Sequence, residues 1–321
     1  MSDDEQQQAV ENGEDDSEQQ EELDEEPAYK QVADFGWSDN GPEEARLVTP
    51  CGISVSQKGD VFVADFGDGK VKVYTKDGEF QRDISHKSEK LENFYPGDVV
   101  VSADDESIYV LGAGNFDDAD NNAIVKFTYD GEAEKEIISE KLKGAISLAV
   151  NSRGLLFAVD RNRRRVIVLD QEGKFIRAIG SRGCDLGKFD TPMYLRFTRR
   201  DFLIVTDIAN RIQVFDPEGS VVRLIQHVPG PTGVSVDMDD QIIVGGAGIR
   251  VLTMKGETVG IIGNRHDGPT TRGIAASKID DVNYVFAVCC KCSLPEGLKS
   301  YVAVYQYDSE KLKQQPKIID N

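Results

Sequence analysis

The 321-residue sequence is poor in the residues that build disulfide-linked, metal-bound and membrane-spanning structures. It contains five cysteines, three histidines and one tryptophan, and all of its apolar runs are short. An odd number of cysteines, gathered mostly toward one end, does not suit a disulfide framework. No stretch approaches the roughly 20 apolar residues that a membrane-spanning helix requires, and the first residues, MSDDEQQQ, are the reverse of a signal peptide. These absences predict a reduced, cytoplasmic chain that does not associate with a membrane.

Motifs for common catalytic chemistry are also missing. The sequence contains no glycine-rich phosphate loop, nucleophile elbow or HExxH motif. Asp118, Asp120 and Asn122 alternate as calcium ligands do, but Ala123 stands where the turn requires glycine. The cluster Cys289, Cys290 and Cys292 has no histidine nearby in sequence, and adjacent residues of a strand point to opposite faces. We therefore expect no catalytic residues, no metal and no cofactor.

Basic residues are absent from the first 27 positions, which hold 13 of the 57 acidic residues. A segment with so much charge and so few apolar residues cannot bury enough surface to offset the entropy of ordering. Residues 1–27 are thus predicted to form a disordered acidic tail. This tail accounts for most of the formal net charge of −20, so the body of the chain is much closer to neutral.

The body contains a nine-residue pattern that recurs six times. Each copy alternates apolar and other residues as a strand does and ends in turn residues, and most copies end in glycine. The copies are KVKVYTKDG (70–78), AIVKFTYDG (123–131), RVIVLDQEG (165–173), RIQVFDPEG (211–219), GIRVLTMKG (248–256) and YVAVYQYDS (301–309).

A second pattern, a pair of apolar residues two positions apart, precedes each copy. Its first members are Ile53, Val99, Leu148, Leu195, Val234 and Ile274, at spacings of 46, 49, 47, 39 and 40 residues. An apolar strand lies between the two patterns each time, and a further strand follows most copies. Six units of four short antiparallel strands predict an all-β fold, a six-bladed β-propeller over residues 28–310, with 311–321 as a C-terminal tail. A β-sandwich or two small barrels is the alternative fold.

The sixth unit ends after its third strand, and the missing fourth strand is found at the start of the body. Residues 29–36, YKQVADFG, match the form of KFIRAIG in the third unit. Pairing of this N-terminal strand with the last unit would close the ring and remove an open sheet edge.

The chain resembles the NHL-repeat propellers, in particular those that end the tripartite-motif (TRIM-NHL) proteins. Asp207, Asn210 and Arg211 match the family pattern. In that pattern an aspartate is followed by a spaced asparagine and then by an arginine that precedes alternating apolar residues. The third unit keeps Asp160 and Arg165 but has Arg163 in place of asparagine. The resemblance implies a recognition platform that binds protein or RNA, and in full-length relatives one that selects targets for a ubiquitin ligase. No RING or B-box spacing of cysteine and histidine occurs here, so ligase activity is not expected to carry over.

Arginines gather in the loops that this fold places on one face. A partner-binding set is predicted at Arg161, Arg163, Arg164, Arg165, Arg182, Arg211 and Arg265, with Trp37 as an aromatic anchor. Aspartates 117, 118 and 120 are expected on the same face, and such a mixed-charge face suits a protein partner at least as well as RNA. Solvated rim charges without a partner are the remaining interpretation.

The sequence therefore predicts a non-catalytic, monomeric recognition scaffold. A protein is the expected partner, RNA is the alternative, and neither DNA nor a membrane is expected. Propeller hydrolases and lyases form a second alternative, but the metal-binding carboxylates or histidines that they need on inner strands are not evident.

Overall fold

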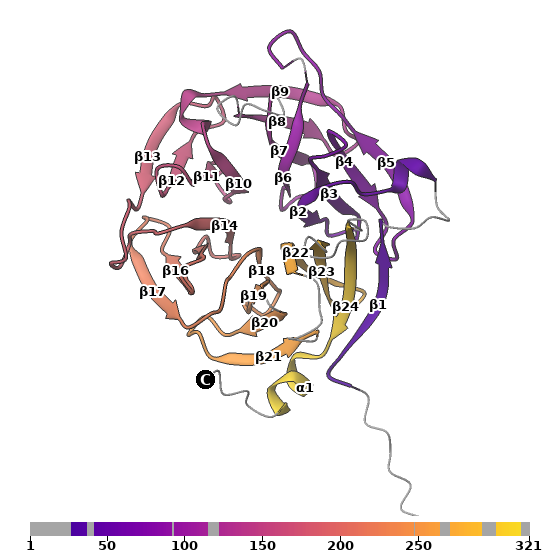
Figure 1. Ribbon diagram of the computed structural model, residues 1–321, viewed down its shortest axis with the longest axis vertical. Coiled ribbons are helices and arrows are strands. Elements are labelled where there is room, and N and C mark those ends of the chain that lie inside the picture. Colours follow the sequence, from indigo (N-terminus) through magenta and orange to yellow (C-terminus); the bar gives the residue numbers. More distant parts are fainter. Residues whose placement is uncertain are drawn as a thin grey trace, which may run out of the picture.

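A computed structural model describes residues 27–36, 42–91, 93–114, 122–246, 248–263, 270–290 and 300–315. It shows six four-stranded antiparallel sheets arranged in a ring, the predicted β-propeller (Figure 1). Blade one comprises β2 (Pro50–Val55), β3 (Val61–Asp65), β4 (Lys70–Tyr74) and β5 (Phe80–Ile84). Blade two comprises β6 (Tyr95–Val101), β7 (Ser107–Ala113), β8 (Asn122–Thr128) and β9 (Ala133–Ile138).

The next three blades repeat this order from the centre outward. Blade three has β10 (Ala145–Val150), β11 (Leu156–Asp160), β12 (Arg165–Leu169) and β13 (Phe175–Ile179). Blade four has β14 (Pro192–Phe197), β15 (Leu203–Asp207), β16 (Arg211–Phe215) and β17 (Val221–Gln226). Blade five has β18 (Val234–Val236), β19 (Ile242–Val244), β20 (Ile249–Leu252) and β21 (Thr258–Ile262).

Blade six joins the two ends of the chain. It contains β22 (Thr270–Ile279), β23 (Val282–Cys290), β24 (Ser300–Tyr307) and, outermost, β1 (Tyr29–Phe35). The register runs from Tyr29 opposite Tyr307 to Phe35 opposite Val302, so the predicted closure by the N-terminal strand is confirmed. The predicted acidic tail, apart from Pro27, lies outside the described residues.

The middle strands are buried because each sheet packs against its two neighbours. All residues of β3, β11, β15 and β16 are buried, whereas outer strands such as β13 are mainly exposed. Burial on both faces explains why the second strands read as continuous apolar runs rather than alternating patterns. Six apolar clusters fill the spaces between the blades.

The glycine of the nine-residue pattern reverses the chain between the third and fourth strands. In blade one, the amide of Gly78 donates to the carbonyl of Thr75 over 3.0 Å, and the Thr75 hydroxyl accepts the amide of Glu79 over 3.1 Å. Gly78 has a φ of 90°, a conformation that only glycine adopts without strain. The equivalent Gly131, Gly173 and Gly219 also have positive φ, so one turn chemistry is used repeatedly.

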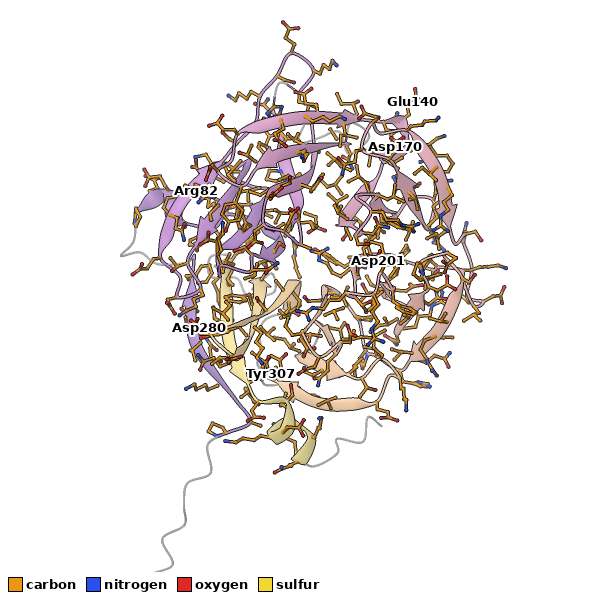
Figure 2. The ribbon with its side chains drawn as sticks, turned by 180° about the vertical axis from the view of Figure 1, so that it is seen from behind. Arg82, Glu140, Asp170, Asp201, Asp280 and Tyr307 are labelled. Atoms are coloured by element: carbon orange, nitrogen blue, oxygen red, sulfur yellow. The ribbon has the colours of Figure 1, made fainter. Side chains whose placement is uncertain are left out.

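Arginines of the outer strands tie neighbouring blades together. Arg82 of β5, labelled in Figure 2, donates from Nη2 to the carbonyl of Tyr129 in blade two over 2.8 Å. Arg177 of β13 makes the corresponding bond to the carbonyl of Pro217 in blade four over 3.2 Å. These arginines reach past their own sheet to the turn that ends the third strand of the next blade.

Helix α1 (Ser309–Gln314) follows β24 and packs against β21 of blade five (Figure 1). The carboxylate of Asp308 caps it by accepting the amides of Glu310 and Lys311 over 2.9 and 3.1 Å. Leu312 is fully buried. The helix thus extends into the predicted C-terminal tail and covers part of the junction between blades five and six.

Candidate functional site

Each propeller face has its own connections. The loops between second and third strands and the loops between blades lie on one side, which we call the loop face. The turns between first and second strands and between third and fourth strands lie on the other side, the turn face. The arginines predicted from the sequence belong to the loop face.

Buried aspartates hold the loops of this face in place. Asp65 ends β3 and accepts the amides of Val48 and Thr49 over 2.8 and 2.7 Å. Asp207 ends β15 and accepts the equivalent amides of Asp190 and Thr191 over the same two distances. Burial raises the pKa of Asp65, although both amide hydrogen bonds act against this. The motif aspartates are therefore structural.

Blade three presents an arginine run above its own buried aspartate. Asp160 is fully buried and accepts the amide of Arg163 over 3.0 Å and Nε of Arg165 over 3.1 Å. Arg164 Nη1 pairs with Asp190 Oδ1 over 2.8 Å. The side chains of Arg163, Arg164 and Arg165 remain 52%, 30% and 25% exposed, so these pairs orient the guanidinium groups without covering them.

Two further predicted residues differ in their surroundings. Arg182 is exposed in the loop from blade three to blade four. Arg211 is only 5% exposed and donates to the carboxylate of Asp207 and to the carbonyls of Gly183, Cys184 and Lys188. This corrects the expectation for Arg211, whose guanidinium anchors the loop from inside and is not presented to a partner.

The remaining members of the predicted set cannot be placed. Arg265, Trp37 and the aspartates at 117, 118 and 120 lie outside the described residues. The arginine sector is defined below as Arg161, Arg163, Arg164, Arg165 and Arg182.

A pocket of about 520 Å³ opens at the centre of the loop face, at the mouth of the channel between the blades. Each blade contributes to its wall the residue at the same repeat position. That residue lies two positions before the first member of the apolar pair in the inner strand. These six residues are Cys51, Gly97, Ile146, Met193, Thr232 and Arg272. Because the ring is complete, the pocket lies on the propeller axis, and we call it the axial pocket.

Aromatic side chains from two first strands, β6 and β14, and from the loop after β3 also line the pocket. Phe66, Tyr95 and Tyr194 supply aromatic surface, and the rings of Phe66 and Tyr95 are 5.7 Å apart. Arg161 enters from the loop after β11, which links the pocket to the arginine sector. The loop face thus combines the cationic arginine sector with the largely apolar axial pocket.

A buried ion pair lies one layer below the pocket. Arg196 of β14 donates from Nη2 to Asp98 Oδ1 over 3.1 Å and from Nη1 to Asp98 Oδ2 over 3.2 Å. It also donates to the carbonyls of Ile53 and Leu148, so one side chain of blade four contacts blades one, two and three. This pair was not predicted from the sequence, although each residue is the sole charge in an apolar inner strand.

The described residues show little that resembles a catalytic centre. They contain no group of three or more histidine, cysteine, aspartate or glutamate side chains arranged to hold a metal ion. Burial raises the pKa of the Cys51 thiol despite the neighbouring Arg272, so at neutral pH this sulfur is a protonated thiol and a weak nucleophile. His86 pairs with Glu136 over 2.7 Å, away from the axial pocket. Among the residues that the structure describes, no helix has the length and apolar character to cross a bilayer.

Comparison with known proteins finds a similarity in sequence to a fly protein. The chain is 21% identical to Protein brain tumor of Drosophila melanogaster over 152 residues, which is 47% of this chain and 14% of the fly protein. No protein-family model matches. Together with the six-bladed ring, the match supports an NHL-like propeller.

Solved structures match over most of the ring. Virginiamycin B lyase of Staphylococcus aureus has a TM-score of 0.57 at 14% identity and covers 87% of this chain and 99% of its own. The Neurospora crassa Pan2 WD40 domain has a TM-score of 0.55 at 9% identity, covering 87% and 95%. A Bacteroides thetaiotaomicron protein of unknown function has a TM-score of 0.60 at 14% identity, covering 86% and 75%. At these identities the likeness concerns the fold alone.

Proposed function

We propose that the protein is a non-catalytic recognition scaffold that binds a protein partner through the arginine sector of its loop face. The loops of the sector are held by hydrogen bonds from their backbone amides to the buried carboxylates of Asp160 and Asp207. Guanidinium groups held in this way bind carboxylates in a bidentate manner and lose little side-chain entropy on binding. An acidic segment of a protein is therefore the partner chemistry that the sector suits best.

The backbone at Arg164 is the observation that carries this proposal. The residue before the third strand has positive φ in four blades, with Gly69 at 69°, Arg164 at 54°, Asn210 at 59° and Gly248 at 82°. Arg164, and not Arg163 as expected from the sequence, therefore occupies the position of Asn210. Glycine and asparagine tolerate this conformation, whereas an arginine there costs on the order of 1 kcal/mol. An unfavourable residue type that adds a cation to an exposed rim fits selection for binding rather than for stability.

Charge reversal on the two faces tests the proposal. One variant carries Arg163→Glu, Arg164→Glu and Arg182→Glu on the loop face. Its matched control carries Arg153→Glu, Arg199→Glu and Arg200→Glu, which are exposed on the turn face and alter net charge equally.

Crosslinking and mass spectrometry of the wild type from nuclease-treated cells would identify partners. We expect the loop-face variant to lose them and the control to keep them, with both unfolding temperatures near that of the wild type. Equal capture by both variants would place the binding site elsewhere. A separate ubiquitin ligase among the captured proteins would connect the scaffold to target selection, as the TRIM-NHL resemblance implies.

RNA is the second candidate, favoured by the exposed guanidinium groups beside the aromatic rings of the axial pocket. Bases stack on such groups, and phosphates pair with them. A net charge of −20 opposes this alternative. It predicts an affinity for single-stranded RNA that falls steeply between low and physiological salt and is lost in the loop-face variant. A lack of RNA binding even at low salt would eliminate it.

A further inference from the structure

We propose that the axial pocket receives one aromatic side chain from the same partner segment whose carboxylates pair with the arginine sector. This assignment rests on the proposed function and deepens it, because it gives the acidic segment an apolar anchor. The continuity of pocket and sector, the chemistry of the wall and the size of the pocket support it.

The pocket and the arginine sector are built from the same two chain segments. Arg161 belongs to both, since it lines the pocket and begins the arginine run after β11. Asp190, which accepts a hydrogen bond from Arg164 Nη1 over 2.8 Å, lies three residues before Met193 of the pocket wall. A partner segment bound to the sector therefore lies beside the pocket.

Aliphatic and aromatic groups form most of the wall. Leu111, Ile146 and Met193 provide aliphatic surface, and Tyr194 provides an aromatic ring. Burial raises the pKa of Tyr194 and the pKa of the Cys51 thiol, so both groups are uncharged at neutral pH. A wall of this kind binds an apolar group by excluding water from it.

Polar side chains of the wall are already hydrogen-bonded within the protein. Asn122 Nδ2 donates to the carbonyl of Ala145 over 2.7 Å. Thr232 Oγ1 donates to the carbonyl of Thr271 over 2.7 Å, and Thr271 Oγ1 accepts the amide of Gly246 over 2.8 Å. A sugar or a nucleobase, with polar groups on several sides, would lose more hydration here than these side chains return. The wall therefore favours a hydrocarbon group.

The size of the pocket suits one bulky side chain. Its volume of about 520 Å³ lies within the range of roughly 300–1,000 Å³ that is typical of small-molecule sites. Aromatic side chains offer the largest apolar area with few rotatable bonds, and they are the usual anchors of protein interfaces. A methionine such as Met193 also makes favourable contacts between its sulfur and an aromatic ring. An aromatic residue is therefore the expected anchor.

The short distance between pocket and sector sets the spacing expected in the partner. Asp190 and Met193 are three residues apart, and three extended residues span at most about 11 Å. An extended partner chain covers about 3.3 Å per residue. Acidic residues about two to five positions from the aromatic residue can thus reach the sector while the ring occupies the pocket.

Four peptides that differ at these positions provide the test. The full peptide contains one phenylalanine, then two glycines and three glutamates, in a glycine–serine chain with blocked termini. The second peptide has alanine in place of phenylalanine, the third has glutamine in place of the glutamates, and the fourth has both changes. Binding to the full chain is measured by calorimetry and by ligand-detected NMR.

We expect the full peptide to bind about tenfold or more tightly than its alanine counterpart, a difference that corresponds to about 1.4 kcal/mol. Met193→Trp, which fills the pocket, should remove this advantage and leave binding of the alanine peptide unchanged. Met193→Gln, which keeps the length of the side chain but makes it polar, should reduce the advantage. The matched control is Met238→Trp on the turn face, where Met238 is 44% exposed, and it should change neither affinity.

Equal affinities of the phenylalanine and alanine peptides, or no binding of any peptide, would overturn the inference. So would an advantage of phenylalanine that both substitutions of Met193 leave unchanged. If binding in these cases still required the glutamates, the proposed function would stand without the anchor. Equal affinities of the glutamate and glutamine peptides, with the phenylalanine advantage kept, would instead refute the acidic partner while the anchor pocket stands.

Two further outcomes are decided by the same measurements. Should Met193→Trp fail to fold, as judged by thermal unfolding, Met193→Gln and the four peptides still decide. Tighter binding of a uridine octanucleotide than of the full peptide, lost in Met193→Trp, would assign the pocket to an RNA base and overturn the inference.

Discussion

Removing Arg196 tests whether the pair beneath the axial pocket holds the ring together. The carboxylate of Asp98 is 0% exposed and accepts hydrogen bonds from the amides of Val99 and Leu148 and the hydroxyl of Ser147. Arg196→Met should leave these hydrogen bonds in place. The substitution removes the opposite charge that Arg196 places 3.1 Å from the Asp98 carboxylate. Breaking a buried pair from one side costs about 3–5 kcal/mol, because an uncompensated charge is left behind.

A loss of this size is a large part of a typical stability of about 5–15 kcal/mol. At about 2–4 °C per kcal/mol for large domains, it lowers the unfolding temperature by roughly 10 °C. Urea unfolding followed by circular dichroism would measure the free energy, and a double-mutant cycle with Asp98→Asn would isolate the pairwise coupling.

The matched control is Arg200→Met on the turn face. The Arg200 side chain is 81% exposed, and its Nε lies 4.0 Å from Asp240. Surface pairs of this kind contribute about 0–1 kcal/mol. If Arg196→Met cost no more than Arg200→Met, or if the cycle showed no coupling, the channel pair would not be a structural tie and the reasoning would be refuted.

Four further changes test other parts of the structure. Burial raises the pKa of Asp237 in the folded state above its ordinary value of 3.8. Between the ordinary pKa and the raised pKa, the folded state binds more protons than the unfolded state, so stability falls as pH rises through that window. Asp237→Asn should flatten this slope in urea unfolding between pH 3.5 and 7, and an unchanged slope would contradict the assignment. Arg164→Asn should raise stability by about 0.5–1 kcal/mol by relieving the positive φ, while weakening partner capture; unchanged capture would argue against the role of this side chain. Gly233→Ala would place Cβ 2.2 Å from the carbonyl oxygen of Arg272 and should cost about 1–3 kcal/mol, whereas Gly97→Ala, with 3.7 Å to its nearest atom, should cost far less; similar costs would contradict the close approach of the inner strands. Deletion of residues 1–26 should leave thermal unfolding nearly unchanged, whereas deletion through Gly36 removes β1 and should cause aggregation visible in light scattering; equal behaviour would refute the closure.

The fold could be predicted in detail because it repeats. Six copies of one strand-and-turn pattern give six chances to recognise each element. Because the last unit lacks a fourth strand, the matching segment at residues 29–36 could be predicted to supply it. The helix α1 was not foreseen, since its six residues are mostly polar and only the burial of Leu312 against blade five shows why it forms.

The site was only partly predictable. Residue type and loop position brought Arg161, Arg163 and Arg164 to one face, but nothing local distinguishes the exposed Arg163 from the buried Arg211. That distinction depends on carbonyls of another loop, 23–28 residues earlier in the chain. The Asp98–Arg196 contact joins residues 98 positions apart, so it could be recognised only from the arrangement of the blades in the ring.

Closure by β1 has a consequence for the newly made chain. β1 leaves the ribosome before every other strand of the ring, and it pairs with β24, the last strand of the ring to be synthesised. At about 5–20 residues per second, tens of seconds separate the two. Throughout that interval the apolar face of β1, including Phe35, lacks the strand that covers it in the finished ring. β1 therefore has uncovered apolar surface until β24 emerges, and a chaperone that binds β1 would protect it during that interval.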